Sequence, residues 1–567
     1  MPNTINYSLP EEIDVAVRKE AERWAVEQKI SRIWAKDASI WTSSDEAKWL
    51  GWLDIVGEEL GGLQKYRDLQ QDIRDGGFTE VLLMGMGGSS LCPEVLAITF
   101  GKKFFHILDS TVPAQIKAIE QQIDISRTLF IVASKSGSTL EPNCFKQYFF
   151  DRVSQVAGAE NAGKQFIAIT DPGSKMEQAA RDQNFRHIFY GKPEIGGRFS
   201  ALSAFGMTAA AAMNLDVEAF LRNADEMVSE CKKDDPLENP GALLGLILGV
   251  CHQNGRDKLT IFTSHDIYDL GAWLEQLIAE STGKNGISII PVDREPALSP
   301  DQYGQDRVFV YLGVKNGDED EELIDELGQL EEAGQPVIRI DLENIESIGQ
   351  EFFRWEFATA VAGSIMEINP FNQPDVEAAK IEAKKLTDEY EKAGSLPPET
   401  PFFEKDGISL FSNDAYAEEL RGLADEETLT GFIEAHLWNL NDDDYFAILA
   451  YIAMNEENEE LLQKIRVAVL QQHGNATCLG FGPRFLHSTG QAYKGGPNTG
   501  VFLQVTSDDE ADIPVPGQKY TFGIVKQAQA RGDFQVLLDR DRRALRVHIG
   551  TGVTIKDGLK TIAAILN

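Results

Sequence analysis

Short apolar runs of strand length alternate with helix-like stretches between residues 79 and 392, and this alternation restricts the folds open to the chain. Each run is rich in β-branched or aromatic side chains and is followed by a turn of small residues. The first set is Val81–Met84, Phe104–Leu108, Leu129–Val132 and Phe166–Thr170, and the second is Leu259–Thr263, Ile287–Val292, Val308–Leu312 and Val337–Ile340. Strands that alternate with helices form parallel sheets covered by helices. We therefore predict an α/β protein with two doubly wound parallel-sheet domains.

The segments on either side of this alternation have different patterns. Residues 1–78 place apolar side chains, five tryptophans among them, at three- and four-residue spacing, which predicts packed amphipathic helices. The loop GSLPPETP at 394–401 is typical of a linker. The region beyond it has strand-like runs at Thr477–Leu479, Val501–Val505 and Phe534–Leu537. The predicted divisions are an N-terminal helical segment at 1–78, α/β domains at 79–235 and 236–392, and a C-terminal mixed α/β region at 393–567.

The chain is strongly acidic, with 53 lysines and arginines against 90 aspartates and glutamates and a formal net charge of −37. Such a surface repels phosphodiester backbones and anionic lipid, so we expect no nucleic-acid or membrane partner. The acidity serves either solubility or adaptation to a salty cytoplasm. A site for an anionic substrate would need local cations and backbone N–H groups to overcome this field.

The five cysteines are far apart and form no CxxC pair, which argues against a disulfide framework or a zinc site and indicates a reducing cytoplasm. The first 24 residues contain no apolar h-region, and no run of about 18 apolar residues occurs. We therefore expect neither a secretory signal nor a membrane span. No HExxH motif or carboxylate cluster indicates a metal, and no cofactor is expected.

The segment GMGGSS, Gly85–Ser90, directly follows a predicted strand. Its glycines let the backbone approach a ligand closely, and its two hydroxyls begin the next helix. A dinucleotide fingerprint is the competing interpretation, but the final glycine of GxGxxG is missing. Asp109 is the only acidic residue near the position that such a site needs at the end of the following strand.

The segment SKSGST, Ser134–Thr139, follows another predicted strand and combines four hydroxyls with one ammonium group. Donors gathered at a helix N-terminus form a site for a phosphate monoester. An ordinary helix-capping loop would need only one or two such residues. We therefore predict that this loop binds phosphate.

Three further stretches carry chemically useful side chains. GGRFS at Gly196–Ser200 presents one arginine from a glycine loop, ESTGK at Glu280–Lys284 ends a predicted helix, and NPFNQPDVEAAK at Asn369–Lys380 opens another. Alone, none of them identifies an enzyme.

In this order, GMGGSS, SKSGST, GGRFSALS, ESTGK and NPFNQPDVE resemble the landmarks of phosphoglucose isomerases, over roughly residues 80–385. The resemblance implies that the two α/β domains are sugar-isomerase (SIS) domains. It implies that Glu280 is the catalytic base, that Arg198 lies beside the developing enediolate, and that Lys380 lies near C1. The implied residues for binding sugar and phosphate are Gly88, Ser89, Ser134, Lys135, Ser136, Thr139 and Gln373.

The family also uses a histidine to open the sugar ring, in an LHSxGQ motif soon after the catalytic glutamate in compact members. The corresponding stretch here, Pro291–Arg307, has no histidine, whereas LHSTGQ occurs at Leu486–Gln491 in the C-terminal region. His487 is therefore our candidate for ring opening. This displaced motif is similar to the isomerase half of bifunctional transaldolase–phosphoglucose isomerases, and the chain has no room for a transaldolase barrel of about 250 residues.

The resemblance implies an aldose–ketose isomerase that interconverts glucose 6-phosphate and fructose 6-phosphate through a cis-enediol(ate), in glycolysis and gluconeogenesis. Two alternatives stay open: a non-catalytic sugar-phosphate sensor, and an isomerase that also accepts mannose 6-phosphate. The expected partner is a small sugar phosphate. The chain is expected to be cytoplasmic, a homodimer or a monomer, and either separate from a transaldolase module or associated or fused with one.

Overall fold

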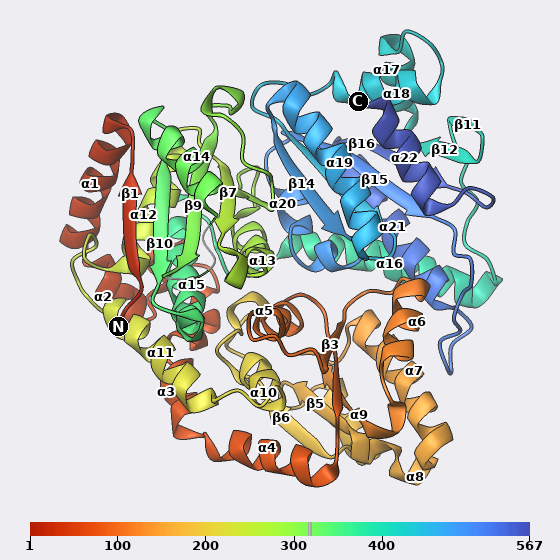
Figure 1. Ribbon diagram of the computed structural model, residues 1–567, viewed down its shortest axis with the longest axis horizontal. Helices are drawn as coiled ribbons and strands as arrows, with labels where there is room; N and C mark the ends of the chain where they lie inside the picture. The colour runs from red at the N-terminus through yellow and green to blue at the C-terminus, as the bar shows by residue number, and fades with distance from the viewer. Residues whose placement is uncertain (316, 318–319, 567) are drawn as a thin grey trace.

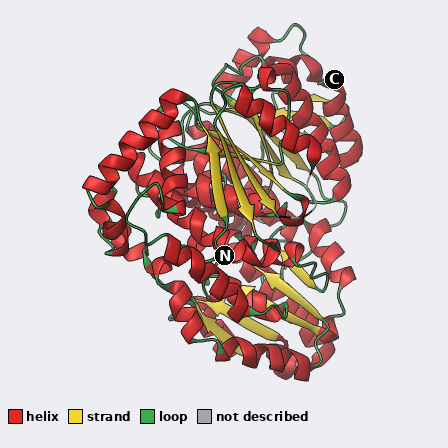
Figure 2. Ribbon diagram, turned by 60° about the vertical axis from the view of Figure 1, so that its left-hand side comes forward, coloured by secondary structure: helices red, strands yellow, loops and turns green. Residues whose placement is uncertain are grey.

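The computed structural model describes residues 1–315, 317 and 320–566, so Asn567, the last residue of the predicted C-terminal region, lies outside it. The described residues form three sheets, each enclosed by helices (Figures 1 and 2). Both predicted parallel-sheet domains are present, and the α/β class is confirmed. The predicted division points at 78/79, 235/236 and 392/393 stay predictions.

The first sheet consists of five parallel strands. In spatial order they are β3 (Phe105–Leu108), β2 (Glu80–Met84), β4 (Thr128–Ala133), β5 (Phe166–Thr170) and β6 (His187–Tyr190). The chain leaves β2 for β3 on one side and then returns to β4 on the other. The gap between β2 and β4 is therefore the topological switch point, where open α/β sheets bind their ligands. GMGGSS follows β2 and SKSGST follows β4, so both motifs lie at this point.

The second sheet repeats this plan and takes one strand from the N-terminus. Its order is β1 (Thr4–Ser8), β10 (Val337–Leu342), β9 (Arg307–Val314), β7 (Lys258–Thr263) and β8 (Ile290–Asp293). β1 pairs antiparallel with β10, whereas the other neighbours are parallel. The mainly helical segment 1–78 thus also supplies an edge strand to a sheet whose other strands come much later in the chain.

The C-terminal region forms a third sheet. Its order is β11 (Phe403–Lys405), β12 (Ile408–Phe411), β16 (Arg543–Ile549), β15 (Gly500–Ser507), β13 (Tyr445–Tyr451) and β14 (Ala476–Phe481). β14, β13, β15 and β16 are parallel, and the first two strands are antiparallel additions. The strand predicted at Phe534–Leu537 is wrong, because these residues lie inside helix α21 (Phe522–Asp539). A short apolar run fits a buried helix as well as a strand.

The helices that position the site belong to the layers around all three sheets. They are α5 (Leu91–Thr99) after β2, α7 (Leu140–Ala157) after β4, α13 (Leu270–Thr282) after β7, α16 (Pro374–Ala393), α19 (Glu456–His473), α20 (Gly490–Gly495) and α21, with the short 3₁₀ helices η4 (Gly87–Ser89), η7 (Gly197–Phe199) and η11 (Arg484–His487). α13 contacts both α5 and α20, and these helices meet where the three sheets converge (Figure 1).

The predicted role of the N-terminal tryptophans as packing groups is confirmed. Trp24, Trp41 and Trp52 are buried in a core that also includes side chains from the first two sheets, and Trp34 and Trp49 pack against it. Trp52 contacts Phe199, the residue after Arg198, with ring centroids 5.4 Å apart. The N-terminal helices therefore support the loop that carries Arg198.

Arg484 of η11 holds the C-terminal region against the first domain. Its guanidinium nitrogens lie 2.6 and 2.7 Å from the carboxylate oxygens of Glu94 on α5, and they also contact Asp109. A bidentate arginine–carboxylate pair fixes orientation as well as distance. The η11 segment, which ends at His487, is thereby fixed against α5.

Two further predictions concern the whole chain. All five cysteines are buried and free. Within the part of the chain that the structure describes, no helix combines the length and the apolar character that crossing a bilayer requires.

Candidate active site

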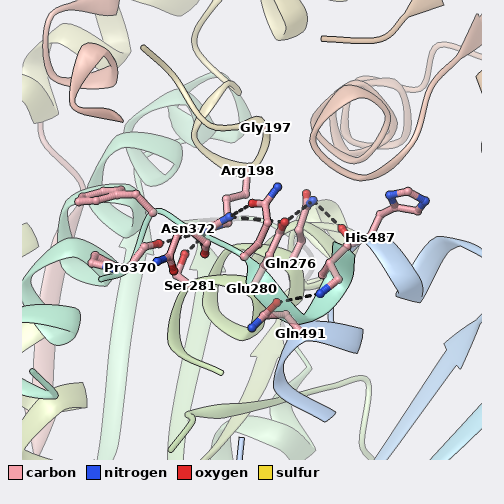
Figure 3. Close-up of polar contacts among 12 residues, drawn as sticks. Gly197, Arg198, Gln276, Glu280, Ser281, Pro370, Asn372, His487 and Gln491 are labelled. Carbon is pink, nitrogen blue, oxygen red and sulfur yellow. Dashed lines mark hydrogen bonds and ion pairs between the residues drawn. The ribbon is translucent and has the colours of Figure 1, made fainter. Parts of the chain in front are cut away.

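Glu280 and Arg198 come together where the last turn of α13 meets η7. Their side chains are 7% and 0% exposed, and the guanidinium Nη1 lies 3.4 Å from Glu280 Oε1. The two residues are far apart in the sequence and come from different domains. The fold therefore brings them together (Figure 3).

Neutral groups fix Arg198 in place. Nε donates to Ser281 Oγ at 2.6 Å, Nη1 to Gln373 Oε1 at 2.6 Å, and Nη2 to the carbonyls of Pro370 at 2.6 Å and Asn372 at 3.1 Å (Figure 3). Burial lowers the pKa of Arg198, and the nearby Glu280 charge opposes that effect. A guanidinium held this way is a preorganised positive charge in a site of low dielectric.

Gln276, one turn before Glu280 on α13, joins Glu280 to the C-terminal region. Its Nε2 donates to Glu280 Oε2 at 3.1 Å and to the backbone carbonyl of His487 at 2.7 Å. Figure 3 shows Gln276 between these two partners. The segment LHSTGQ therefore lies beside the predicted catalytic base, although it follows that base by about 200 residues.

His487 pairs with a carboxylate from the first domain. Its Nε2 lies 2.8 Å from Oε1 of Glu141, in the first turn of α7, and the two side chains are 10% and 5% exposed. Burial alone would raise the pKa of Glu141, but the charge of His487 and its hydrogen bond outweigh burial and leave this pKa lowered. An ionised carboxylate that orients an imidazole is the pairing that acid–base histidines use.

Gln491, the last residue of LHSTGQ, ties three motifs together. Its Oε1 accepts from the backbone N–H groups of Asp375 and Val376 at the start of α16, at 2.9 and 3.1 Å. Its Nε2 donates to the Gly283 carbonyl at 2.7 Å and to Asp375 Oδ2 at 2.6 Å. Both ends of this buried amide are thus hydrogen-bonded. They hold the start of α16, the helix that carries Lys380 and follows Gln373, against the end of α13.

Two glycine loops touch at the centre of the site. A Cβ atom on Gly88 would lie only 2.1 Å from the Gly197 carbonyl oxygen, so any side chain there would push the Arg198 loop away. Ser89 is half-buried beside this contact. The next residue, Ser90, donates to Asp109 Oδ2 at 3.0 Å and is engaged in the structure of the loop.

The SKSGST loop presents several hydroxyls before α7. Ser134 is buried, and its Oγ has no hydrogen-bond partner within the described residues. Ser136 is exposed, with its Oγ 2.8 Å from Ser138 Oγ, and Thr139 is half-buried at the helix N-terminus. Lys135 differs from the others, because its ammonium pairs with Asp171 and donates to the Lys192 carbonyl at 2.8 Å.

Lys380 lies on α16 with its side chain 37% exposed, and its Nζ is 2.8 Å from Glu377 Oε1. It is near enough to Glu141 for its charge to contribute to the lowered pKa of that carboxylate. The structure thus places Lys380 on the His487 side of the site, engaged with a neighbour on its own helix.

A separate cavity of about 70 Å³ lies along α13. Glu275, the residue before Gln276, lines it together with Asp293, Arg294 and side chains of α19. Burial raises the pKa of Glu275, and the charge of Asp293 raises it further. α13 therefore presents one glutamate to the Arg198 cluster and another to this cavity.

Comparison of the sequence with known families supports the resemblance that the motifs indicate. A family model described as phosphoglucose isomerase matches residues 51–294, which include Gly88, the SKSGST loop, Arg198 and Glu280. The structure and the sequence relatives agree with this match. The glucose-6-phosphate isomerase of Methanocaldococcus jannaschii is 27% identical over 58% of this chain and 88% of its own length. That of Rubrobacter xylanophilus is 29% identical over 56% of this chain and 84% of its own length. Over residues 51–294 the chain is similar to phosphoglucose isomerases.

Solved structures agree on the fold. A hypothetical protein from Thermus thermophilus superposes with a TM-score of 0.56 at 24% identity, over 67% of this chain and 99% of its own. A glucose-6-phosphate isomerase from Chlamydia trachomatis gives a TM-score of 0.51 at 21% identity, over 58% of this chain and 74% of its own.

Glu141, Gln276 and Arg484 contribute to this site, and the sequence alone did not indicate them. An acidic residue in the first turn of a helix is ordinary, since it complements the helix dipole, so Glu141 carried no distinguishing signal. The position of Gln276 one turn before Glu280 was visible in the sequence. Its second partner, a carbonyl 211 residues away, was not.

Proposed function

We propose that this chain is an aldose–ketose isomerase that interconverts glucose 6-phosphate and fructose 6-phosphate, in glycolysis and gluconeogenesis. One observation carries the proposal: Glu280 and Arg198 form a buried pair, and Gln276 links Glu280 directly to the segment that carries His487. A carboxylate, a fixed cation and a carboxylate-paired imidazole are the groups that an enediolate mechanism needs in one place.

Ring opening comes first. The C1–O5 bond breaks while the ring oxygen gains a proton and the C1 hydroxyl loses one. His487, oriented by Glu141, is the group suited to exchange the proton of the ring oxygen. Lys380 approaches from α16 and serves the C1 side once its side chain turns from Glu377.

Proton transfer follows in the open-chain sugar. Glu280 takes the proton from C2 and returns it to C1, or the reverse. In the same direction the hydroxyl proton passes from O2 to O1, so that the C1 carbonyl becomes a hydroxyl and the C2 hydroxyl becomes a carbonyl. Arg198 stabilises the negative charge that develops on the enediolate oxygens between these two steps. Ser281, Gln373 and the two carbonyls hold the guanidinium in place without a charge of their own, so Glu280 is the charged group beside it.

The phosphate group is assigned to the SKSGST loop. Three hydroxyls, those of Ser134, Ser136 and Thr139, lie before or at the N-terminus of α7 and can donate to phosphate. The buried Ser134 hydroxyl has no hydrogen-bond partner among the described residues. Such remote contacts supply binding energy away from the reacting carbons. Lys135 acts through Asp171, by holding the loop in shape.

We further propose that His487 acts within its own chain, because Arg484 and Gln276 fix it beside Glu141 and Glu280 of the same molecule. A monomer then suffices for catalysis. The buried free cysteines favour a cytoplasmic location. Association with a transaldolase module stays a prediction from the displaced LHSTGQ motif.

The test is a coupled assay of the purified full chain with fructose 6-phosphate, glucose 6-phosphate and mannose 6-phosphate as separate substrates. We expect conversion between the first two and none of the third. Conversion of mannose 6-phosphate at a comparable kcat/KM would establish the dual-specificity alternative. Binding of fructose 6-phosphate without any turnover would contradict the isomerase hypothesis and support the sugar-phosphate sensor.

A further inference from the structure

Glu141 accepts a second hydrogen bond, and the donor comes from the C-terminal region. Gln529 on α21 is buried, and its Nε2 lies 2.6 Å from Glu141 Oε1. This is the same oxygen that lies 2.8 Å from His487 Nε2. One carboxylate oxygen of the first domain is therefore contacted by side chains from two segments of the C-terminal region, η11 and α21.

The orientation of the Gln529 amide is determined by its neighbours. A carboxylate only accepts hydrogen bonds, so the NH₂ group must face Glu141. The amide oxygen is left for Thr111, whose Oγ1 donates to it at 2.7 Å. Thr111 lies just after β3 and is fully buried. The chain of hydrogen bonds thus runs from Thr111 to Gln529 to Glu141.

Thr111 and Glu141 lie within residues 51–294, which the phosphoglucose isomerase model matches, whereas Gln529 lies outside them on α21, a helix of the C-terminal region. α21 also packs along α16, the helix of Lys380. The C-terminal region therefore contributes His487 and, in addition, a second contact to the carboxylate that orients it.

We propose that Gln529, oriented by Thr111, is a positioning residue for ring opening, which holds the Glu141 carboxylate in the place and the charge state that His487 requires. The inference rests on the proposed isomerase function. A charge-assisted hydrogen bond from an amide favours the ionised carboxylate and restrains its rotation. Without it, Glu141 keeps His487 as a partner but is free to turn about its terminal bonds.

A packing role and a positioning role make different predictions. If Gln529 only fills space, an apolar side chain of similar length lowers stability and leaves kcat unchanged. If it positions Glu141, the same change lowers kcat for every reaction that opens the sugar ring. KM stays nearly constant, since the phosphate loop and Arg198 are untouched.

Ring opening can be measured apart from isomerisation. Opening followed by reclosure on either face of C1 interconverts the α and β anomers of glucose 6-phosphate, a step that does not need Glu280. Exchange between the two anomeric NMR signals, catalysed by the enzyme, therefore reports on the groups that open the ring, which are His487 with its supports and Lys380, and not on Glu280. Anomer exchange in the Glu280→Gln variant provides the reference.

The experiment compares Gln529→Met, Thr111→Val and Thr111→Ser in the full chain. We expect Gln529→Met to lower kcat and anomer exchange about 10-fold, the loss of roughly one hydrogen bond to a charged group, with KM within about 2-fold of wild type. Thr111→Val removes the hydroxyl that orients the amide and is expected to give a smaller loss of both rates, which Thr111→Ser restores. Gln535→Met, at an exposed position of the same helix, is the matched control.

Melting temperatures of all variants show whether each has folded, and Thr111→Val keeps the test decisive if Gln529→Met does not fold. Unchanged kcat and anomer exchange in folded Gln529→Met, or in folded Thr111→Val if Gln529→Met does not fold, would overturn this inference while leaving the proposed function in place. A folded wild type that does not convert fructose 6-phosphate would overturn both.

Discussion

Nε2 of His487 and Oε1 of Glu141 lie 2.8 Å apart although 346 positions of sequence separate the residues. The pair spans the interface between the C-terminal region and the first domain. Both side chains are nearly buried, so the interaction is shielded from bulk water. The pair explains how a histidine in a displaced motif can reach a site formed mainly by the two SIS domains.

Replacing Glu141 tests this relationship directly. Glu141→Gln keeps the shape of the side chain but removes the charge that orients and balances an imidazolium. We expect kcat to fall about 100-fold, with KM changed far less. The control is Glu321→Gln, which alters an exposed acid in the first turn of another helix, α14 (Glu321–Glu332). Equal losses in both variants would contradict a specific role.

Glu280 and Glu275 offer a matched pair on one helix. Glu280→Gln is expected to lower kcat for isomerisation by about three orders of magnitude while sugar-phosphate binding and anomer exchange persist. Glu275→Gln mimics the protonated form that burial favours in the separate cavity, so its kcat is expected to stay within about 2-fold of wild type. Full isomerase activity in the Glu280→Gln variant would show that Glu280 is not the catalytic base.

Mixing two inactive variants tests whether His487 acts within one chain. Glu280→Gln and His487→Ala each lack a different group, so subunits that exchange histidines would recover activity when mixed. We expect no recovery, and a specific activity that is independent of protein concentration. Light scattering after size exclusion gives the mass at each concentration. Recovery on mixing would instead show that a neighbouring copy supplies the histidine.

We expect the Ser134 hydroxyl to lower the stability of the fold and to strengthen the binding of the substrate phosphate. Its buried Oγ has no partner among the described residues, and an unsatisfied buried hydroxyl costs about 1–3 kcal/mol. Ser134→Ala should therefore fold at least as stably as wild type, and its KM for fructose 6-phosphate should rise about 10-fold if the hydroxyl binds phosphate. A melting temperature that drops while KM stays constant would assign the hydroxyl a structural role.

The stability of the C-terminal region is expected to fall in acid because of His436. This residue is fully buried on α18 (Leu429–Leu437), with Nδ1 2.8 Å from Tyr416 Oη, and burial lowers its pKa from 6.5 to about 3. Between these values the unfolded chain binds a proton that the folded chain does not, so stability is lost as pH falls below 6.5. We expect a loss of about 2 kcal/mol at about pH 5 relative to about pH 8.

Urea midpoints measured at both pH values check this expectation. His436→Gln is expected to reduce the difference between the two midpoints, whatever its effect on stability at the higher pH. The exposed His265 provides the control, because His265→Gln should leave the difference unchanged. A wild-type midpoint that does not depend on pH would contradict the burial argument.

Local patterns were sufficient for elements whose hydrophobic period is unambiguous. The strands predicted at Val81–Met84, Leu129–Val132 and Phe166–Thr170 appear as β2, β4 and β5 because completely buried parallel strands read as continuous apolar runs. Phe534–Leu537 has the same local appearance inside α21, and only its packing between the third sheet and α16 makes it helical. β1 is a strand because β10, far along the chain, offers it a free edge.

By itself the sequence determined the α/β class, the order of the motifs and the residue types that could perform sugar isomerisation, since each depends on neighbours within about one helical turn or one strand. The tertiary structure alone decided which of these residues meet. Glu280 with Arg198, and His487 with Glu141, are pairs whose members come from different domains. Their proximity results from burying three sheets against shared helices, a property of the whole fold that no local pattern encodes.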